Sequence, residues 1–481
     1  MKIMKTQITN QKFHLGIKLT AIALFLTSAS LANATAYTSS ITVNGTTRTF
    51  ADGDSITTTS GYSLSVSHNG FVNMQNPTDS ITVSGENAIA ISSNGNVSFG
   101  NNAVISGGTY ALRSSGAGNF TAGDFLKVTG AIYSTESSII SVGDNANITG
   151  RVDMRTGSEM TFGNNAIIEN DSATMAAVYA AGAKVDLASG AYVKSENKTA
   201  LHTTGDGGEL TASNGTFIGN YGLQLGPSDN KMTLTNSDVI GYTVGVQIEN
   251  SRSMSTQPEL NLIGGSMTVL NGSAIRSYDT ADRIGGAIIN ISGGAIVTSS
   301  NGELVNYAQE NATSNLTLNV SGAGTEVYGV VNTTGGMNMS VTDNAKWTST
   351  GSSNMDNLTL DNAELEFNMT SISDSITTGN LTLEGNSTVL VGFTNDFLEE
   401  VLATGLMDNL DASIVTSFLD GAGDLSYSFK TSNDTGSTWD IVDNGDGTFD
   451  ISNINIIPEP STYAIIFGLL ALAFATYRRR K

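Results

Sequence analysis

The strongest constraint on the fold is a short unit that recurs loosely along the chain. The unit reads FGNNAVI at residues 99–105, VGDNANI at 142–148 and FGNNAII at 162–168. Related units, each with a glycine before a short apolar segment, follow near residues 187, 213, 263 and 291. Their glycines lie roughly 20 to 30 residues apart, a spacing typical of one repeat in a solenoid protein.

The side-chain pattern within each unit is that of a strand with one buried face. Apolar residues alternate with Thr, Ser and Asn, so that one kind points inward and the other outward. Gly and Asn between the strands tolerate the positive φ angles that sharp corners require. We therefore predict an all-β fold, a right-handed parallel β-helix over residues 37–393 with three short strands per turn. Roughly 15 turns at ~4.8 Å each would make a rod of ~70 Å.

Composition limits the partners and the chemistry. The chain has 44 acidic and 22 basic residues, and eight of the basic ones lie in two terminal segments, at 2–18 and 478–481. The remainder is therefore strongly acidic, which argues against nucleic acid or anionic lipid as a partner and favours solubility or the binding of cations. No Cys is present, which excludes disulfides and thiolate metal sites.

No cofactor and no metal site are predicted. Asp443, Asp446 and Asp450 form an oxygen-rich loop, but the positions between them that a calcium loop would use are Gly445 and Gly447. We interpret this loop as a β-hairpin turn.

The N-terminus has the pattern of a secretory signal peptide. Lys2, Lys5, Lys12 and Lys18 precede an apolar run at 19–26, and Ala-Asn-Ala follows at 32–34. Residues 1–36 are therefore expected to be removed during export, which leaves a mature chain that starts near Tyr37.

The C-terminus has the pattern of a short membrane anchor behind a proline motif. Pro458, Glu459 and Pro460 precede an uncharged run at 464–477, which would span only ~22 Å as a helix. A basic cluster behind the run would stop its transfer across a membrane; the cluster consists of Arg478, Arg479, Arg480 and Lys481.

Together, residues 458–481 resemble the PEP-CTERM sorting signal of Gram-negative bacteria. The resemblance implies that exosortase, a membrane protease-transpeptidase, recognises Pro458, Glu459 and Pro460. It also implies a transient single-pass stay in the inner membrane, followed by release to the cell surface or the exterior. A permanent C-terminal anchor is the alternative.

A second resemblance covers residues 341–393. VTDNAKWTSTGS at 341–352 and the Leu-Thr-Leu triplets at 358–360 and 381–383 resemble the last turns of a pertactin-like autotransporter passenger domain. This resemblance implies that Trp347 plugs the end of the core and that the central Thr of each triplet points outward. An autotransporter would continue into an outer-membrane barrel, whereas here the PEP-CTERM segment follows.

Residues 394–457 interrupt the repeat and are expected to form a cap. A short helix is predicted at 394–402, where Asp396 and Glu399 have the spacing of a capping box. A β-hairpin is predicted at 439–451, around Asn444 and Gly445.

One dense cluster of mixed charge suggests a binding site. Arg151, Asp153 and Arg155 would share one face of a strand, and Glu159 follows. The cluster is interpreted either as an ion-pair ladder on the surface or as a glycan-binding patch.

No catalytic residue is predicted. β-Helix enzymes that cleave polysaccharides use paired carboxylates, and no Asp-Asp pair is present. His68 and His202 are interpreted as exposed coil residues. The leading hypothesis is an adhesin-like, non-catalytic surface or matrix protein that contacts extracellular polysaccharide or another cell-surface ligand. A polysaccharide-modifying enzyme is the alternative, and an ice-binding protein is a third, which the irregular Thr spacing disfavours.

Overall fold

The computed structural model describes most of the repeat region and short segments after it. These described residues are 34–249, 256–277, 286–307, 315–371, 374–393, 426–427, 438–443 and 449–455. The predicted signal peptide, the helix at 394–402 and the C-terminal segment 458–481 lie outside them.

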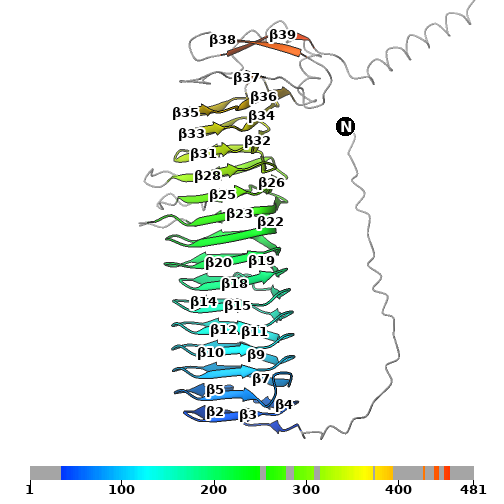
Figure 1. The fold of residues 1–481 in the computed structure, drawn as a ribbon, viewed down its shortest axis with the longest axis vertical. Coiled ribbons are helices and arrows are strands. Elements are labelled where there is room, and N and C mark those ends of the chain that lie inside the picture. The colour runs from blue at the N-terminus through cyan, green and yellow to red at the C-terminus, as the bar shows by residue number, and fades with distance from the viewer. Residues whose placement is uncertain are drawn as a thin grey trace, which may run out of the picture. The chain divides into compact units, whose positions relative to one another are not determined.

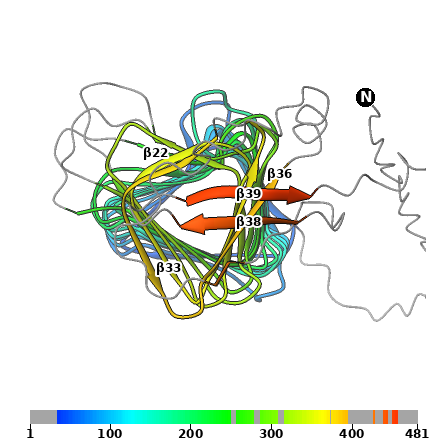
Figure 2. The ribbon, with the colours of Figure 1, turned by 90° about the horizontal axis from the view of Figure 1, so that it is seen from above.

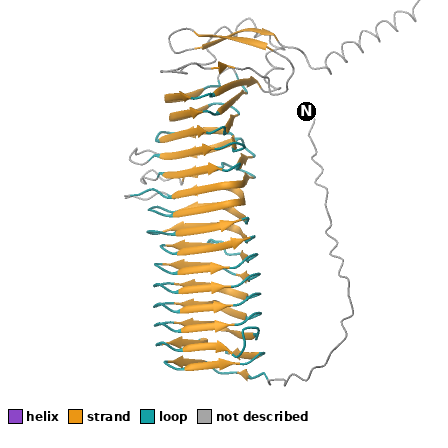
Figure 3. Ribbon diagram, viewed as in Figure 1, coloured by secondary structure: helices purple, strands orange, loops and turns teal. Residues whose placement is uncertain are grey.

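The described chain is all-β and winds into a parallel β-solenoid of about 14 turns (Figure 1). Strands are its only regular elements within these residues, as the colouring of Figure 3 shows. Each turn contributes to three parallel ladders, which form three sides when the stack is viewed along its axis (Figure 2). The predicted all-β parallel solenoid is thus confirmed, and its strands lie in three ladders as expected.

The first ladder begins at the N-terminal end of the solenoid and is the longest of the three. Its members are β1 (Ala36–Tyr37), β4 (Asp54–Thr57), β7 (Ile81–Ile91), β9 (Val104–Ser114), β11 (Lys127–Ser134), β13 (Asn147–Thr149), β16 (Ile167–Asn170), β19 (Tyr192–Thr204), β21 (Thr216–Leu225), β22 (Lys231–Ile248), β23 (Glu259–Val269), β26 (Ile296–Ser299), β29 (Glu326–Tyr328), β32 (Lys346–Ser349), β34 (Glu364–Met369), β36 (Thr388–Phe393) and β37 (Ser426–Tyr427).

The second ladder shares its long strands with the first, because these strands bend at a corner and continue. It consists of β2 (Ile41–Asn44), β5 (Tyr62–Ser67), the second halves of β7, β9 and β11, then β14 (Val152–Arg155), β17 (Val178–Ala181), the ends of β19, β21 and β22, then β24 (Ile275–Ser277), β27 (Glu303–Tyr307) and β30 (Val330–Thr333).

The third ladder closes each turn. It consists of β3 (Thr47–Phe50), β6 (Phe71–Met74), β8 (Asn96–Phe99), β10 (Asn119–Ala122), β12 (Ile139–Val142), β15 (Glu159–Phe162), β18 (Lys184–Ser189), β20 (Glu209–Ser213), the starts of β22 and β23, then β25 (Ala287–Ser292), β28 (Leu316–Ser321), β31 (Met337–Thr342), β33 (Ser353–Asp361) and β35 (Ile376–Glu384). A separate antiparallel pair is formed by β38 (Thr438–Asp443) and β39 (Phe449–Asn455).

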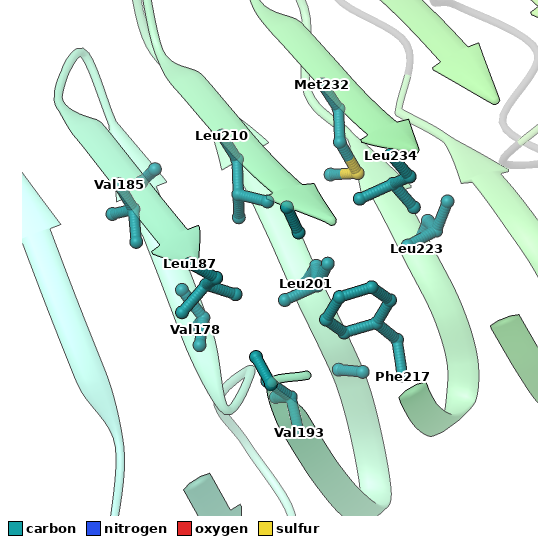
Figure 4. Packing of buried hydrophobic residues seen from close by; sticks show 14 of the residues in the cluster. Val178, Val185, Leu187, Val193, Leu201, Leu210, Phe217, Leu223, Met232 and Leu234 are labelled. Carbon is teal, nitrogen blue, oxygen red and sulfur yellow. The ribbon is translucent and has the colours of Figure 1, made fainter. Parts of the chain in front are cut away.

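The inward-facing side chains of all three ladders form one continuous apolar core. In the middle of the solenoid, Val178, Leu201 and Leu223 stack in register on the second ladder (Figure 4). They meet Leu210 of the third ladder and Phe217 of the first, and all five side chains are buried. Full burial stabilises each such side chain by about 1.5–3 kcal/mol relative to exposure. The core is therefore built from alternate residues of each strand, as the sequence pattern predicts.

The recurrent Gly-Asn/Asp unit forms the corner between the third and first ladders. The backbone N–H of Asp144 donates to Asp124 Oδ1 of the preceding turn (2.9 Å), and the N–H of Asn164 donates to Asp144 Oδ1 (2.6 Å). The next residue of the unit has a positive φ, as at Asn145 (59°) and Asn165 (58°). Each corner is thus tied to the neighbouring turn by a side-chain oxygen that satisfies an otherwise free backbone donor.

The glycine of the unit leaves room for this tie. A Cβ placed on Gly143 would lie 2.5 Å from Asp124 Oδ1 and 2.7 Å from the carbonyl carbon of Gly123. A Cβ on Gly163 would lie 2.4 Å from Asp144 Oδ1. The repeat therefore reflects a close approach between successive turns.

Trp347 is buried, and its Nε1 donates to the carbonyl oxygen of Gly329 (3.0 Å). The expectation that it plugs the end of the core is wrong, because β34 and β36 add further turns of the same ladder beyond β32. The Leu-Thr-Leu prediction holds at 358–360, where both leucines are buried and Thr359 faces outward.

The tie between corners makes a testable prediction. Gly143→Ala should lower the free energy of unfolding by about 1–3 kcal/mol, because the added methyl forces Asp124 away from its neighbour. The measurement is the midpoint of urea unfolding. Gly108→Ala is the matched control, since its Cβ meets nothing closer than 3.4 Å; equal shifts for the two variants would contradict this account of the corner.

Candidate functional site

The second ladder carries one outward-facing column of large polar and aromatic side chains. Strand register places these residues directly above one another in successive turns. The column reads Arg113, Tyr133, Asp153, Tyr179, His202, Gln224, Gln247 and Arg276. The inward position next to it is apolar in every one of these turns, from Leu112 to Ile275. A single surface thus gathers side chains from residues far apart in sequence.

Tyrosines and arginines alternate at the N-terminal end of this column. The rings of Tyr110 and Tyr133 lie 5.7 Å apart, and the Arg113 guanidinium lies 5.9 Å from each ring centroid. The Arg155 guanidinium lies 5.4 Å from the Tyr133 centroid and 5.5 Å from that of Tyr179. Cations at such distances are attracted by the ring faces, which holds both guanidiniums against the sheet.

Asp153 lies beneath this layer. Arg155 Nε and Nη2 donate to its two carboxylate oxygens (2.7 and 3.1 Å), and Arg151 Nη2 lies 3.5 Å from Oδ2. The Asp153 side chain is 2% exposed although it points away from the core. The hydrogen bonds that Arg155 donates to Asp153 raise the pKa of Arg155. Asp153 therefore fixes the position of both guanidiniums.

A second hydrogen-bonded group follows two turns later. His202 packs edge-to-face on Tyr179 with ring centroids 4.9 Å apart, and its Nε2 lies 3.4 Å from Glu249 Oε2. Gln224 donates to the same carboxylate and accepts from Thr199 Oγ1 (2.7 Å).

The Glu249 carboxylate stays ionised in this group. Burial raises its pKa, but the close approach of the His202 ring, the hydrogen bond from Gln224 and the charge of Lys198 outweigh burial. The pKa of Glu249 therefore lies below its ordinary value.

The C-terminal end of the column repeats the arrangement of cation and ring. Arg276 donates from Nε and Nη2 to Gln247 Oε1 (3.1 and 2.9 Å), and its guanidinium lies 5.6 Å from the Tyr221 centroid. Lys198 Nζ lies 5.7 Å from the same ring. We call the whole surface the aromatic-cation face; it comprises Tyr110, Arg113, Tyr133, Arg151, Asp153, Arg155, Tyr179, Lys198, His202, Tyr221, Gln224, Gln247, Glu249 and Arg276.

The structure brings the predicted charged cluster together in part. Arg151, Asp153 and Arg155 are in contact, although Arg151 precedes β14 and Asp153 is buried. Glu159 lies on β15 of the third ladder, where it pairs with Ile139 and Lys184, and so does not belong to the cluster. The interpretation of His202 as an exposed coil residue is wrong, because it lies in β19 against Tyr179. His68 is an exposed turn residue, as expected.

Sequence reasoning missed Tyr133, Tyr179, His202 and Glu249. Neighbours in the column are separated by 20 residues between Tyr133 and Asp153 but by 26 between Asp153 and Tyr179. Tyrosines at 110, 133 and 179, separated by 23 and 46 residues, are the signal that the sequence offers. The alignment of these tyrosines along the solenoid can be recognised only once the strand register is known.

Comparisons with known proteins do not assign the chain. No family model matches it, and no curated protein matches it. Within the residues that the structure describes, no group of three or more His, Asp or Glu is arranged to hold a metal ion. None of those residues belongs to a helix of the length and apolarity that a membrane span requires.

The buried ion pair makes a testable prediction. A double-mutant cycle of Asp153→Ala and Arg155→Ala should give a coupling free energy of about 1–2 kcal/mol, because the bidentate pair is covered by two rings. The same cycle on Lys184 and Glu209, an exposed pair at 3.4 Å, should give less than about 1 kcal/mol. Both are measured by urea unfolding, and equal couplings would contradict the special role of Asp153.

The environment of Glu249 predicts a dependence on pH. Its lowered pKa stabilises the fold fully above the unfolded-state pKa of about 4.3, and this stabilisation is lost as pH falls through the folded-state pKa. Glu249→Gln should therefore lose stability less steeply than the wild type below about pH 5. The free energy of unfolding across this range is the measurement. Glu136→Gln is the control because Glu136 lies at an exposed corner. In this variant the free energy of unfolding should fall with pH as steeply as in the wild type.

Proposed function

We propose that this protein is an exported, adhesin-like, non-catalytic surface or matrix protein that binds extracellular polysaccharide through the aromatic-cation face. The observation that carries the proposal is the in-register column of rings, guanidiniums and amides on one ladder. The sorting of the chain by exosortase and a right-handed winding of the solenoid are part of the same proposal.

The chemistry of the face suits a sugar chain. Tyrosine rings offer flat apolar surfaces to the C–H faces of pyranoses, and their hydroxyl groups form hydrogen bonds at the edge. Guanidiniums supply donors in fixed directions for hydroxyl or carboxylate oxygens. The amides of Gln224 and Gln247 are buried and instead hold Glu249 and Arg276 in place. Because Arg155, Tyr133 and Tyr179 already hold one another, binding would freeze few side chains, which lowers its entropic cost.

The two carboxylates of the face favour binding over catalysis. Glycoside hydrolysis needs a carboxylic acid with a raised pKa beside a second, free carboxylate. Here both oxygens of Asp153 accept from Arg155, and the pKa of Glu249 is lowered rather than raised. The column also changes residue type at almost every turn, unlike the regular Thr array of an ice-binding face.

The sequence of both ends supports export. The N-terminal pattern at 1–36 and the PEP-CTERM-like segment at 458–481 are those of a protein carried across the inner membrane and held there before release. A long array of outward Ser, Thr and Asn suits exposure to an extracellular matrix.

Glycan binding is tested with variants of the two central rings. Tyr133→Ala and Tyr179→Ala should each weaken binding to extracellular polysaccharide of the host by tenfold or more, measured by affinity electrophoresis. Tyr192→Ala is the matched control, because Tyr192 faces outward from the first ladder. Binding that all three variants retain would refute a role for this face.

Sorting is tested by the mass of the protein in its native host. The extracellular species should end near Pro458, which would place cleavage at the proline motif. Replacing Pro458, Glu459 and Pro460 by alanine should leave full-length chain in the inner membrane. An unprocessed wild-type chain in that membrane would instead support a permanent anchor.

A further inference from the structure

The distribution of arginine on this acidic protein is uneven. The chain carries 44 acidic residues against 22 basic ones, so most of its surface disfavours anions. Among the described residues there are five arginines, and four of them belong to the aromatic-cation face: Arg113, Arg151, Arg155 and Arg276. The fifth, Arg48, lies in the first turn, over Tyr37 and Phe50. Guanidinium groups, although not lysines, are thus concentrated on one ladder.

The face retains a positive balance after its internal ion pairs are counted. Asp153 and Glu249 are its carboxylates, whereas four arginines and Lys198 are its permanent cations. Arg151 and Arg155 share the single carboxylate of Asp153. Arg113 and Arg276 form no ion pair with any carboxylate among the described residues; they contact Tyr62 Oη (3.3 Å) and Gln247 Oε1 instead.

The two arginines at the ends of the column are therefore placed to receive an anion. The hydrogen bond to Tyr62 raises the pKa of Arg113, so that its guanidinium stays charged. The guanidiniums of Arg113 and Arg276 lie 5.9 and 5.6 Å from a tyrosine ring centroid. Their hydrogen bonds within the described residues use only Nη1 of Arg113 and only Nε and Nη2 of Arg276, which leaves other donors for an outside acceptor. Carboxylate and sulfate groups match this donor geometry.

The spacing of the column matches a linear polymer. Successive residues of the column lie one strand spacing apart, about 4.8 Å, so that Arg113 and Arg276 are separated by seven steps or ~34 Å. An extended sugar chain has nearly the same length per pyranose as one turn of the solenoid. A chain laid along the axis would thus advance by about one sugar per turn. Its sugars would meet the exposed and half-buried members of the face, since Asp153, Gln224 and Gln247 are buried.

We propose that the ligand of the aromatic-cation face is an anionic polysaccharide, rich in uronate or sulfated sugars, extended along the solenoid axis with about one sugar per turn. This inference rests on the proposed function and names its substrate class. The accessible parts of Tyr133 and Tyr179, including their hydroxyl groups, contact the sugars, while Arg113 and Arg276 bind acidic groups near the ends of the bound segment. Asp153 does not repel the ligand because Arg151 and Arg155 cover its oxygens.

The test compares two forms of one polymer. The full-length protein is titrated calorimetrically with polygalacturonate and with the same polymer after complete methyl esterification, in buffer with EDTA so that divalent cations cannot bridge. We expect polygalacturonate to bind at least tenfold more tightly. Because the charge is removed from the polymer, the comparison does not depend on any variant folding correctly.

Variants assign the charge recognition to residues. Arg113→Gln and Arg276→Gln should each weaken polygalacturonate binding about fivefold and leave binding of the esterified polymer unchanged. Arg48→Gln, outside the face, should change neither. With oligogalacturonides of increasing length, affinity should rise up to about eight sugars and then level off.

The outcomes separate this inference from the proposed function. Equal binding of both polymers, lost in Tyr179→Ala, would overturn the anionic ligand and keep polysaccharide binding. A plateau at two or three sugars would overturn the axial placement. Failure to bind either polymer, together with failure to bind neutral polysaccharides, would overturn both proposals.

Discussion

The structure depends on one constraint: each strand finds its hydrogen-bond partners one full turn away in the chain. Parallel pairing joins residues from 18 positions apart, as for Lys346 and Glu364, to 30 apart, as for Ile296 and Glu326. The last pairing, of β36 with β37, joins residues 38 positions apart. Every turn must therefore present its strands at the same height and in the same register as the turn before. The corner glycines, the Asp and Asn side chains that tie corners together and the unbroken apolar core all serve this stacking.

The same constraint creates the candidate site. Residues at one register position form a column along the solenoid. Side chains of related chemistry can therefore line up over many turns, and no cleft or loop is needed to bring them together. Between Arg113 and Arg276, rings, guanidiniums, amides and a carboxylate occupy this column in strand register, and several neighbours are in contact, such as Tyr179 with His202 and Gln247 with Arg276. Many modest contacts with a repeating polymer can then add up to useful affinity, because one side of the interface is already rigid.

The sequence sufficed for the fold class but not for the site. Alternating apolar residues and the GNNA corners directly predict strands, corners and a solenoid, since these signals are local. The site depends on register, and register cannot be counted when the length of a turn varies, as between Tyr133, Asp153 and Tyr179. The prediction that Trp347 lies at the end of the core is wrong for a related reason. The sequence predicts that this residue is buried, but it does not predict how many turns follow.

The distance between spin labels at the two ends of the column tests this account most directly. The chain has no Cys, so labels on Arg113→Cys and Arg276→Cys report a single pair. Seven strand spacings predict a narrow distribution of label-to-label distances centred at ~34 Å, measured by pulsed electron paramagnetic resonance. A broad distribution, or a centre displaced by more than one spacing of about 5 Å, would contradict the common register on which both the fold and the aromatic-cation face depend.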